Sequence, residues 1–124
     1  MIDSDVLIWY LRGNKNAKDL VDKNIPFAIS AITYMELIQG MRDKQELSLF
    51  KKYMERWSVE IIPVDKSICA KAMYFVETYF LSHSLELTDA MIAATALEKQ
   101  EPLITGNEKH YRFIPDIQLN VFKP

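Results

Sequence analysis

The sequence predicts an α/β fold with a mainly parallel central sheet of about five strands flanked by helices, in a single domain over residues 1–124. Two observations predict this fold. Short apolar segments alternate along the chain with longer segments in which apolar residues recur at helical spacing. Residues that start or stop helices, such as Asp65 and Gly13, separate these segments. The chain is long enough for one domain with a proper core.

The first half of the chain contains four expected helices and two expected strands. Asp3 or Asp5 can cap an apolar helix that Gly13 ends. Leu47 and Phe50 belong to a set of apolar residues that recur at helical spacing among charged ones, which is typical of an amphipathic helix. We expect helices over 6–11, 15–23, 33–41 and 45–57, and strands over 26–30 and 59–64.

The second half contains two expected helices and two expected strands. Asp65 can cap a long helix that continues to about residue 81, with Ile68, Ala72 and Val76 on one stripe. An alanine-rich helix is expected over 88–99, where small side chains allow it to lie close to a sheet. Strands are expected over 102–105 and, at the sheet edge, over 117–122.

Composition limits the classes of protein that the chain can belong to. The formal net charge of −2 gives no overall basic surface, so the net charge does not indicate a nucleic-acid partner. The single cysteine, Cys69, excludes an internal disulfide framework and suits a reducing compartment. No apolar run approaches the roughly 18 residues of a membrane span. The N-terminal residues lack the basic segment with which a signal peptide begins. We therefore expect a cytoplasmic protein with no membrane partner.

Three acidic residues stand where helices are expected to begin: Asp3, Glu36 and Asp89. Ligand sites of parallel α/β folds lie beyond the carboxyl ends of the strands, so the sheet would bring these carboxylates to one edge. Each acid also has a purely structural explanation. Asp3 and Asp89 suit helix starts, where caps and the helix dipole favour negative charge. Thr33 and Glu36 match a capping box.

Electrostatics distinguishes a shared site from three separate caps. Two carboxylates about 5 Å apart repel by roughly 3 kcal/mol at an effective dielectric constant near 20. A cluster therefore raises the pKa values of its members or recruits a cation. Oxygen ligands suit Mg²⁺ or Mn²⁺, and such an ion can activate water and stabilise charge on a phosphate. The acids thus predict phosphodiester hydrolysis.

Four segments in order along the chain carry a resemblance to a known family: residues 3–8, 32–40, 89–97 and 103–111. Their pattern resembles the PIN domain, in particular the VapC toxins of bacterial toxin–antitoxin pairs. The resemblance implies an Mg²⁺- or Mn²⁺-dependent endoribonuclease that hydrolyses RNA with a metal-activated water. It implies that Asp3, Glu36 and Asp89 bind the metal. Asn107 stands where the family often has aspartate, and it is expected to orient the water or a ligand.

The resemblance also implies a homodimer and a cognate VapB-type antitoxin. Arg12 and Lys15 follow the first helix, where basic residues are either a solvated face or contacts to RNA phosphates. Under the second interpretation they are the candidate substrate-binding residues. His110 follows Asn107 closely and is either a surface residue or a contact of the site. Because only Met1 and Ile2 precede the first acid, the first strand is very short or the chain starts later than its relatives.

Two alternatives follow from individual residues. The uncharged Asn107 also suits a PIN-like domain that is catalytically weak or inactive and only binds a protein partner. A phospho-accepting receiver domain likewise clusters acids at a parallel sheet, with Asp65 as its candidate acceptor. Lys109 lies too far beyond its strand to complete such a site. Site geometry, rather than fold, decides between these classes.

Overall fold

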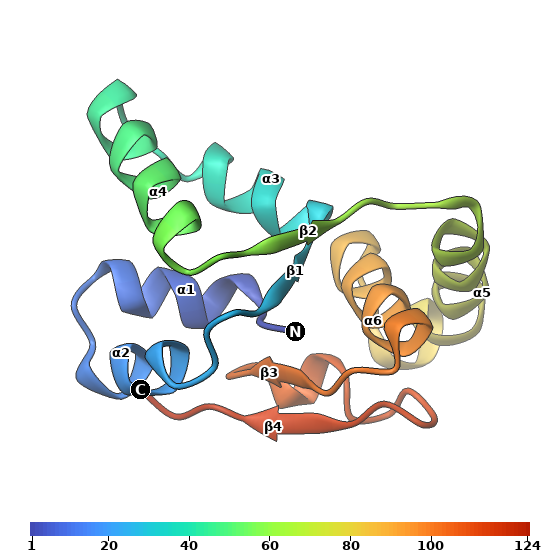
Figure 1. Ribbon diagram of the computed structural model, residues 1–124. Helices are drawn as coiled ribbons and strands as arrows, with labels where there is room; N and C mark the ends of the chain where they lie inside the picture. The colour runs from blue at the N-terminus through green and yellow to red at the C-terminus, as the bar shows by residue number, and fades with distance from the viewer.

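Short strands and longer helices alternate along the chain, as the sequence predicts (Figure 1). The computed structural model describes residues 1–124. The helices are α1 (Ser4–Leu11), α2 (Lys15–Asp22), α3 (Ala31–Gln39), α4 (Lys44–Arg56), α5 (Lys66–His83) and α6 (Leu87–Lys99), with a 3₁₀ turn η1 (Glu108–His110). The strands are β1 (Ala28–Ser30), β2 (Glu60–Ile62), β3 (Leu103–Thr105) and β4 (Leu119–Val121). These bounds differ from the predicted ones by at most two residues.

All strand pairs are parallel, which confirms the predicted fold class. β1 pairs with β2 and β3 pairs with β4, as two sheets of two strands each. The N-terminal residues join them, because Ile2 forms a parallel bridge with Ile104 and its amide donates to the Ala28 carbonyl oxygen at 3.1 Å. The hydrogen-bonded order is therefore β2, β1, the N-terminal segment, β3 and β4. The expected first strand is reduced to this bridge.

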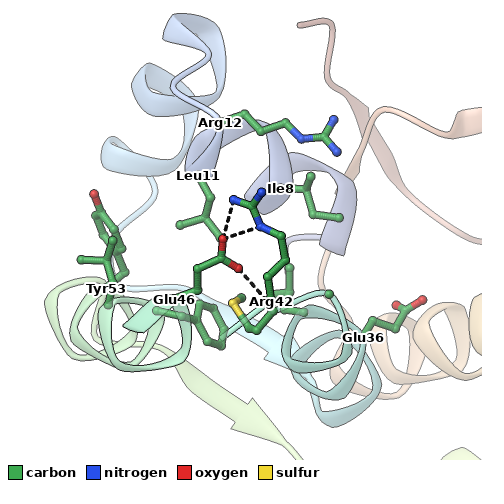
Figure 2. A pocket seen from close by; sticks show the side chains of 12 residues that line it. Ile8, Leu11, Arg12, Glu36, Arg42, Glu46 and Tyr53 are labelled. Carbon is green, nitrogen blue, oxygen red and sulfur yellow. Dashed lines mark hydrogen bonds and ion pairs between the residues drawn. The ribbon is translucent and has the colours of Figure 1, made fainter. Parts of the chain in front are cut away.

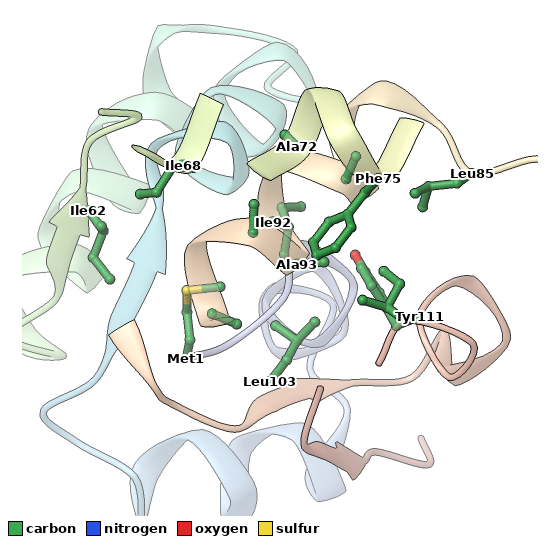
Figure 3. Close-up of a cluster of buried hydrophobic side chains, with 14 of the residues drawn as sticks. Met1, Ile62, Ile68, Ala72, Phe75, Leu85, Ile92, Ala93, Leu103 and Tyr111 are labelled. Carbon is green, nitrogen blue, oxygen red and sulfur yellow. The ribbon is translucent and has the colours of Figure 1, made fainter. Parts of the chain in front are cut away.

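Two apolar clusters fill the two faces of this layer. Successive residues of a strand point to opposite faces, so the three central segments contribute alternately to each cluster. The α5–α6 cluster, part of which Figure 3 shows, comprises Met1, Ala28, Ile62, Ile68, Ala72, Phe75, Leu85, Ala90, Ile92, Ala93, Ala94, Ala96, Leu103, Tyr111 and Ile114. The α1–α4 cluster comprises Ile2, Val6, Leu7, Tyr10, Ala17, Val21, Phe27, Ile29, Leu37, Phe50, Trp57, Ile104 and Phe122.

Helix starts follow the predicted caps with one exception. Asp3 accepts from the Ser4 amide and Asp65 accepts from the Ile68 amide, so both acids cap their helices. The capping box predicted for Thr33 and Glu36 is wrong. Strand β1 runs directly into α3, whose cap is the hydroxyl of Ser30. Glu36 therefore lies in the second turn of α3, where its carboxylate is not used for capping.

None of the helices combines the length and the apolar character that crossing a membrane requires.

Candidate active site

Asp3 lies at the centre of the candidate site, at the carboxyl end of the N-terminal segment. Its side chain is buried, with 3% of its surface exposed. Oδ1 accepts from the Ser4 amide at 2.8 Å, and Oδ2 accepts from the Thr105 hydroxyl at 2.9 Å. The Tyr111 hydroxyl lies 3.0 Å from the same Oδ2. These donors satisfy a buried carboxylate that would otherwise be costly to bury.

Asp89, in the first turn of α6, faces Asp3 across the hydroxyl of Tyr111. The phenol oxygen is 3.1 Å from Asp89 Oδ1, and His110 Nδ1 is 3.1 Å from Asp89 Oδ2. Burial raises the pKa of Asp89, while His110 and Tyr111 oppose this rise. Burial and the charges of Asp3 and Asp89 raise the pKa of Tyr111, so the phenol keeps its proton. His110 is therefore a contact of the site rather than only a surface residue.

Glu36 reaches the site from α3. One of its carboxylate oxygens, Oε1, is buried and has no hydrogen-bond partner. Burial raises the pKa of Glu36, and repulsion by Asp3 and Asp89 raises it further, with a smaller opposing effect from Ser4. Asp3 and Asp89 thus lie close enough to Glu36 for their charges to act on it.

Asp5 is a fourth carboxylate beside this group. Its Oδ2 accepts from the Gly106 amide at 2.8 Å, and its buried Oδ1 has no partner. Burial and the neighbouring charge of Asp3 raise the pKa of Asp5 to about 6. Because Asp3 is the cap of α1, Asp5 instead fastens the first turn of that helix to the loop after β3.

The other predicted residues lie around the acids. Asn107 follows β3, and its backbone amide donates to the Thr105 hydroxyl at 3.0 Å, whereas its exposed side chain makes no hydrogen bond with an acid. Arg12 is the C-cap of α1, exposed, with its guanidinium 5.8 Å from the Trp9 ring. Lys15 begins α2 and is also exposed. These three side chains therefore lie outside the hydrogen bonds that link Asp3 and Asp89 through Tyr111, whereas Glu36 interacts with those two acids through their charges.

Tyr111 is the site residue that the sequence did not reveal. Its side chain is fully buried in the α5–α6 cluster, where an aromatic residue is expected for packing alone. The available signal was a tyrosine, rather than a residue without a hydroxyl, at a buried position directly after a polar turn. Buried tyrosine hydroxyls usually find a hydrogen-bond partner, and here the partners are two carboxylates.

The carboxylate oxygens of the site are chemically suited to a divalent cation, although hydrogen bonds within the protein orient their side chains. As they stand, no three His, Cys, Asp or Glu side chains are grouped closely enough to hold one ion. The unpartnered Glu36 oxygen and the mutual repulsion of the acids nevertheless leave carboxylate charge uncompensated. Oxygen ligands of this kind suit Mg²⁺ or Mn²⁺.

A groove extends from Glu36 between α1, α3 and α4, with a volume of about 590 Å³. Its lining is mainly apolar, and Arg42 pairs with Glu46 at its rim. Figure 2 shows Glu36 at one end of the groove, with its carboxylate turned away from the other labelled side chains. The lining residues are Ile8, Leu11, Arg12, Glu36, Leu37, Gly40, Met41, Arg42, Glu46, Leu49, Phe50 and Tyr53.

The fold and the site together define a parallel α/β domain with a carboxylate site at the carboxyl edge of its strands. A model of the PIN domain matches residues 1–114 of the chain. Ribonuclease VapC10 from Mycobacterium tuberculosis is 36% identical over 115 residues, which cover 90% of this chain and 84% of the relative. Ribonuclease VapC1 from Methanocaldococcus jannaschii is 28% identical, with 98% of this chain and 85% of the relative covered.

Solved structures agree with this assignment. A toxin–antitoxin complex from Klebsiella pneumoniae contains a chain of TM-score 0.75 and 30% identity, covering 94% of this chain and 92% of that chain. VapBC-1 from nontypeable Haemophilus influenzae gives a TM-score of 0.80 at 26% identity, covering 98% and 96%. The chain belongs to the PIN domain family and, within it, to the VapC ribonuclease toxins.

Proposed function

We propose that this chain is the toxin of a type II toxin–antitoxin pair and hydrolyses RNA phosphodiester bonds as a divalent-cation-dependent endoribonuclease. The observation that carries the proposal is that the charges of Asp3 and Asp89 both act on Glu36, whose Oε1 is buried and unpartnered. The relatives named as ribonucleases, VapC10 and VapC1, support the reaction class.

The residues of the site have distinct proposed roles. Asp3, Glu36 and Asp89 would hold an Mg²⁺ or Mn²⁺ ion. Such an ion supplies a polarised water as nucleophile and neutralises charge that develops on the phosphate. His110 holds one oxygen of Asp89 in place at 3.1 Å. The Asn107 side chain, which makes no hydrogen bond within the protein, is free to orient a water or the RNA.

Removal of charge from the acids tests this proposal. Asp3→Asn and Asp89→Asn are expected to abolish RNA cleavage in Mg²⁺, because each removes a ligand charge while keeping the side-chain shape. Asp116→Asn is the matched control, since Asp116 is exposed and far from the acids in the chain. Thermal unfolding with and without Mn²⁺ should show stabilisation of the wild type and little of either site variant. Wild-type cleavage rates in Asp89→Asn would contradict the mechanism.

A catalytically weak protein-binding module is the alternative, favoured by the uncharged Asn107 and by the absence of a ready-made group of three ligands. The two functions differ in a metal titration of the wild type. The module predicts neither Mg²⁺-dependent cleavage nor stabilisation by Mn²⁺, whereas the nuclease predicts both.

We assign the α1–α3–α4 groove to an antitoxin segment. Its apolar lining suits the anchors of an amphipathic peptide, and Glu36 at its end would attract a basic side chain. The Klebsiella and Haemophilus structures are toxin–antitoxin complexes, which supports a partner of this kind. Leu49→Lys, at a lining residue that is 53% exposed, should weaken capture of the product of the neighbouring gene. Undiminished capture would contradict the assignment.

We place RNA contacts at Arg12 and Lys15. Arg12 borders the groove that leads to Glu36, and both basic side chains are exposed. Positive charges there would hold RNA phosphates without reading sequence. Arg12→Gln and Lys15→Gln should raise KM for RNA with little change in kcat, whereas Lys66→Gln on the distant start of α5 should change neither. An unchanged KM in both site variants would contradict the placement.

We further propose a homodimer formed through the apolar stripe of α5. This stripe consists of Met73, Tyr74, Phe80 and Leu81, which recur seven residues apart on one face and are 53–94% exposed. Leu81→Lys is expected to give a monomer in light scattering, while Leu49→Lys leaves the dimer intact. If Leu49→Lys gives a monomer and Leu81→Lys stays dimeric, the dimer interface is the α1–α3–α4 groove and not the stripe of α5.

A further inference from the structure

The hydroxyl of Tyr111 has an unusual position for a core residue. Its ring lies among the apolar side chains of the α5–α6 cluster (Figure 3), and the whole residue has no exposed surface. The phenol oxygen nevertheless reaches the acidic site, 3.0 Å from Asp3 Oδ2 and 3.1 Å from Asp89 Oδ1. Packing alone does not require a polar atom there.

The contacts of the two carboxylates show what this hydroxyl contributes. Asp3 has further donors in the Ser4 amide and the Thr105 hydroxyl. Asp89 has His110 on its other oxygen, and Tyr111 is the only donor within reach of Asp89 Oδ1. Tyr111 therefore carries the one hydroxyl within hydrogen-bond distance of both carboxylates, and its single proton is donated to one of them at a time.

We propose that Tyr111 is a positioning residue, whose hydroxyl holds the carboxylates of Asp3 and Asp89 side by side as ligands for a divalent cation. The cation in this statement rests on the proposed function, whereas the hydrogen-bonded bridge does not. Carboxylates repel when they are brought together, and a hydroxyl placed between them, which can donate its one proton to either, offsets part of that repulsion before a cation arrives. Groups that hold ligands in place commonly change metal affinity by about 10–100-fold.

Tyr111→Phe tests the hydroxyl while it keeps the ring that packs in the core. In isothermal titration with Mn²⁺, we expect this variant to bind about tenfold more weakly than the wild type. Tyr79→Phe is the matched control, because Tyr79 packs against the same cluster and its hydroxyl makes no hydrogen bond. If the wild type binds Mn²⁺ and Tyr111→Phe binds it with equal affinity, the proposal is overturned. It is also overturned if Tyr79→Phe loses as much Mn²⁺ affinity as Tyr111→Phe.

A second measurement needs no metal and separates this proposal from the proposed function. In EDTA, urea unfolding of Tyr111→Phe, Asp89→Ala and the double variant forms a double-mutant cycle. We expect the effect of Tyr111→Phe to shrink when Asp89 has already been removed. If the wild type binds no Mn²⁺ but the two substitutions are clearly coupled, the metal site is contradicted, whereas the hydrogen-bonding role of Tyr111 stands. Independent effects of the two substitutions would overturn the positioning role whatever the metal result.

Discussion

The carboxylate of Asp5 occupies the space that a side chain at position 106 would need. A Cβ on Gly106 would lie 2.6 Å from Asp5 Oδ2 and 3.4 Å from the Phe122 carbonyl oxygen. Gly106→Ala must therefore displace Asp5 or the backbone, and we expect it to lower the free energy of unfolding by about 1–3 kcal/mol. Urea unfolding measures this loss.

Gly40 provides the control for that substitution. Its backbone is helical, and an added Cβ would meet only carbonyl oxygens at 3.5 Å or more. Gly40→Ala should leave stability unchanged or slightly increased, because alanine restricts the unfolded chain. If Gly106→Ala and Gly40→Ala change the free energy of unfolding equally, the close approach of Asp5 is not the reason that position 106 requires glycine.

The pKa of Asp5 gives a prediction with a definite sign. Burial and Asp3 raise this pKa from 3.8 to about 6, so the folded protein binds the proton more tightly than the unfolded chain. The resulting stability is fully present below about pH 4 and is lost as the pH rises through about 6. Asp5→Asn should remove this part of the pH dependence and stabilise the protein at pH 7 by about 1 kcal/mol, allowing for solvent screening.

Urea unfolding of the wild type and Asp5→Asn in EDTA, from pH 4 to pH 7, checks this expectation. The stability difference between the two proteins should grow with pH, in favour of the variant. Asp5 is not among the groups that raise the pKa values of Glu36 and Asp89, so the contributions of these two acids should cancel in the difference. A difference that is flat with pH would show that Asp5 ionises in the folded protein as in the unfolded one.

At the residue scale, the sequence predicts which acidic residues belong to the site better than it predicts which side chains contact them. Glu36 lies in the second turn of α3 rather than at a helix start, but Asp3 and Asp89 were identifiable as acids at the starts of α1 and α6. The bridge by Tyr111 was not, because residue periodicity indicates burial of a ring and says nothing about its hydroxyl. The relation of Asn107 to the acids likewise depends on a turn whose geometry no local pattern specifies.

At the element scale, the two long C-terminal helices differ in how they begin. Asp65 caps α5 through a hydrogen bond to the Ile68 amide at 2.8 Å, whereas Glu86 stands at the N-cap of α6 without a side-chain bond. Asp65→Ala should therefore cost about 1 kcal/mol of stability. Glu86→Ala should cost only a few tenths of a kcal/mol. Chemical denaturation of both variants tests the contrast, and a larger loss from Glu86→Ala would reverse it.

Helices were predicted closely because their signals are local, namely caps and apolar spacing within one segment. Strands depend on partners far away in the chain. The shortest case is the N-terminal segment, where Ile2 joins Ala28 on one side and Ile104 on the other. Its few residues give no periodicity. The sequence allowed a very short first strand to be expected, because only two residues precede Asp3, but the two partners of that segment could not be predicted.

At the scale of the whole molecule, the two apolar clusters should unfold as one unit. The central strand segments carry residues of both clusters on alternate positions, so neither face can lose its packing without exposing the other. Ile68 of the α5–α6 cluster is fully buried, and Ile68→Val should cost about 0.5–1.5 kcal/mol. Both tryptophans lie on the opposite side, Trp57 in the α1–α4 cluster and Trp9 on α1.

Tryptophan fluorescence and far-UV circular dichroism therefore report on different parts of the same transition. In a cooperative domain, Ile68→Val shifts the urea midpoint equally by both measurements, although it touches only the face without tryptophan. Ile29→Val, on the α1–α4 side, should behave alike, and the two losses should add to within about 0.5 kcal/mol in the double variant. A fluorescence midpoint that stays in place while the dichroism midpoint moves would show that the two faces unfold separately, joined only weakly through the N-terminal bridge.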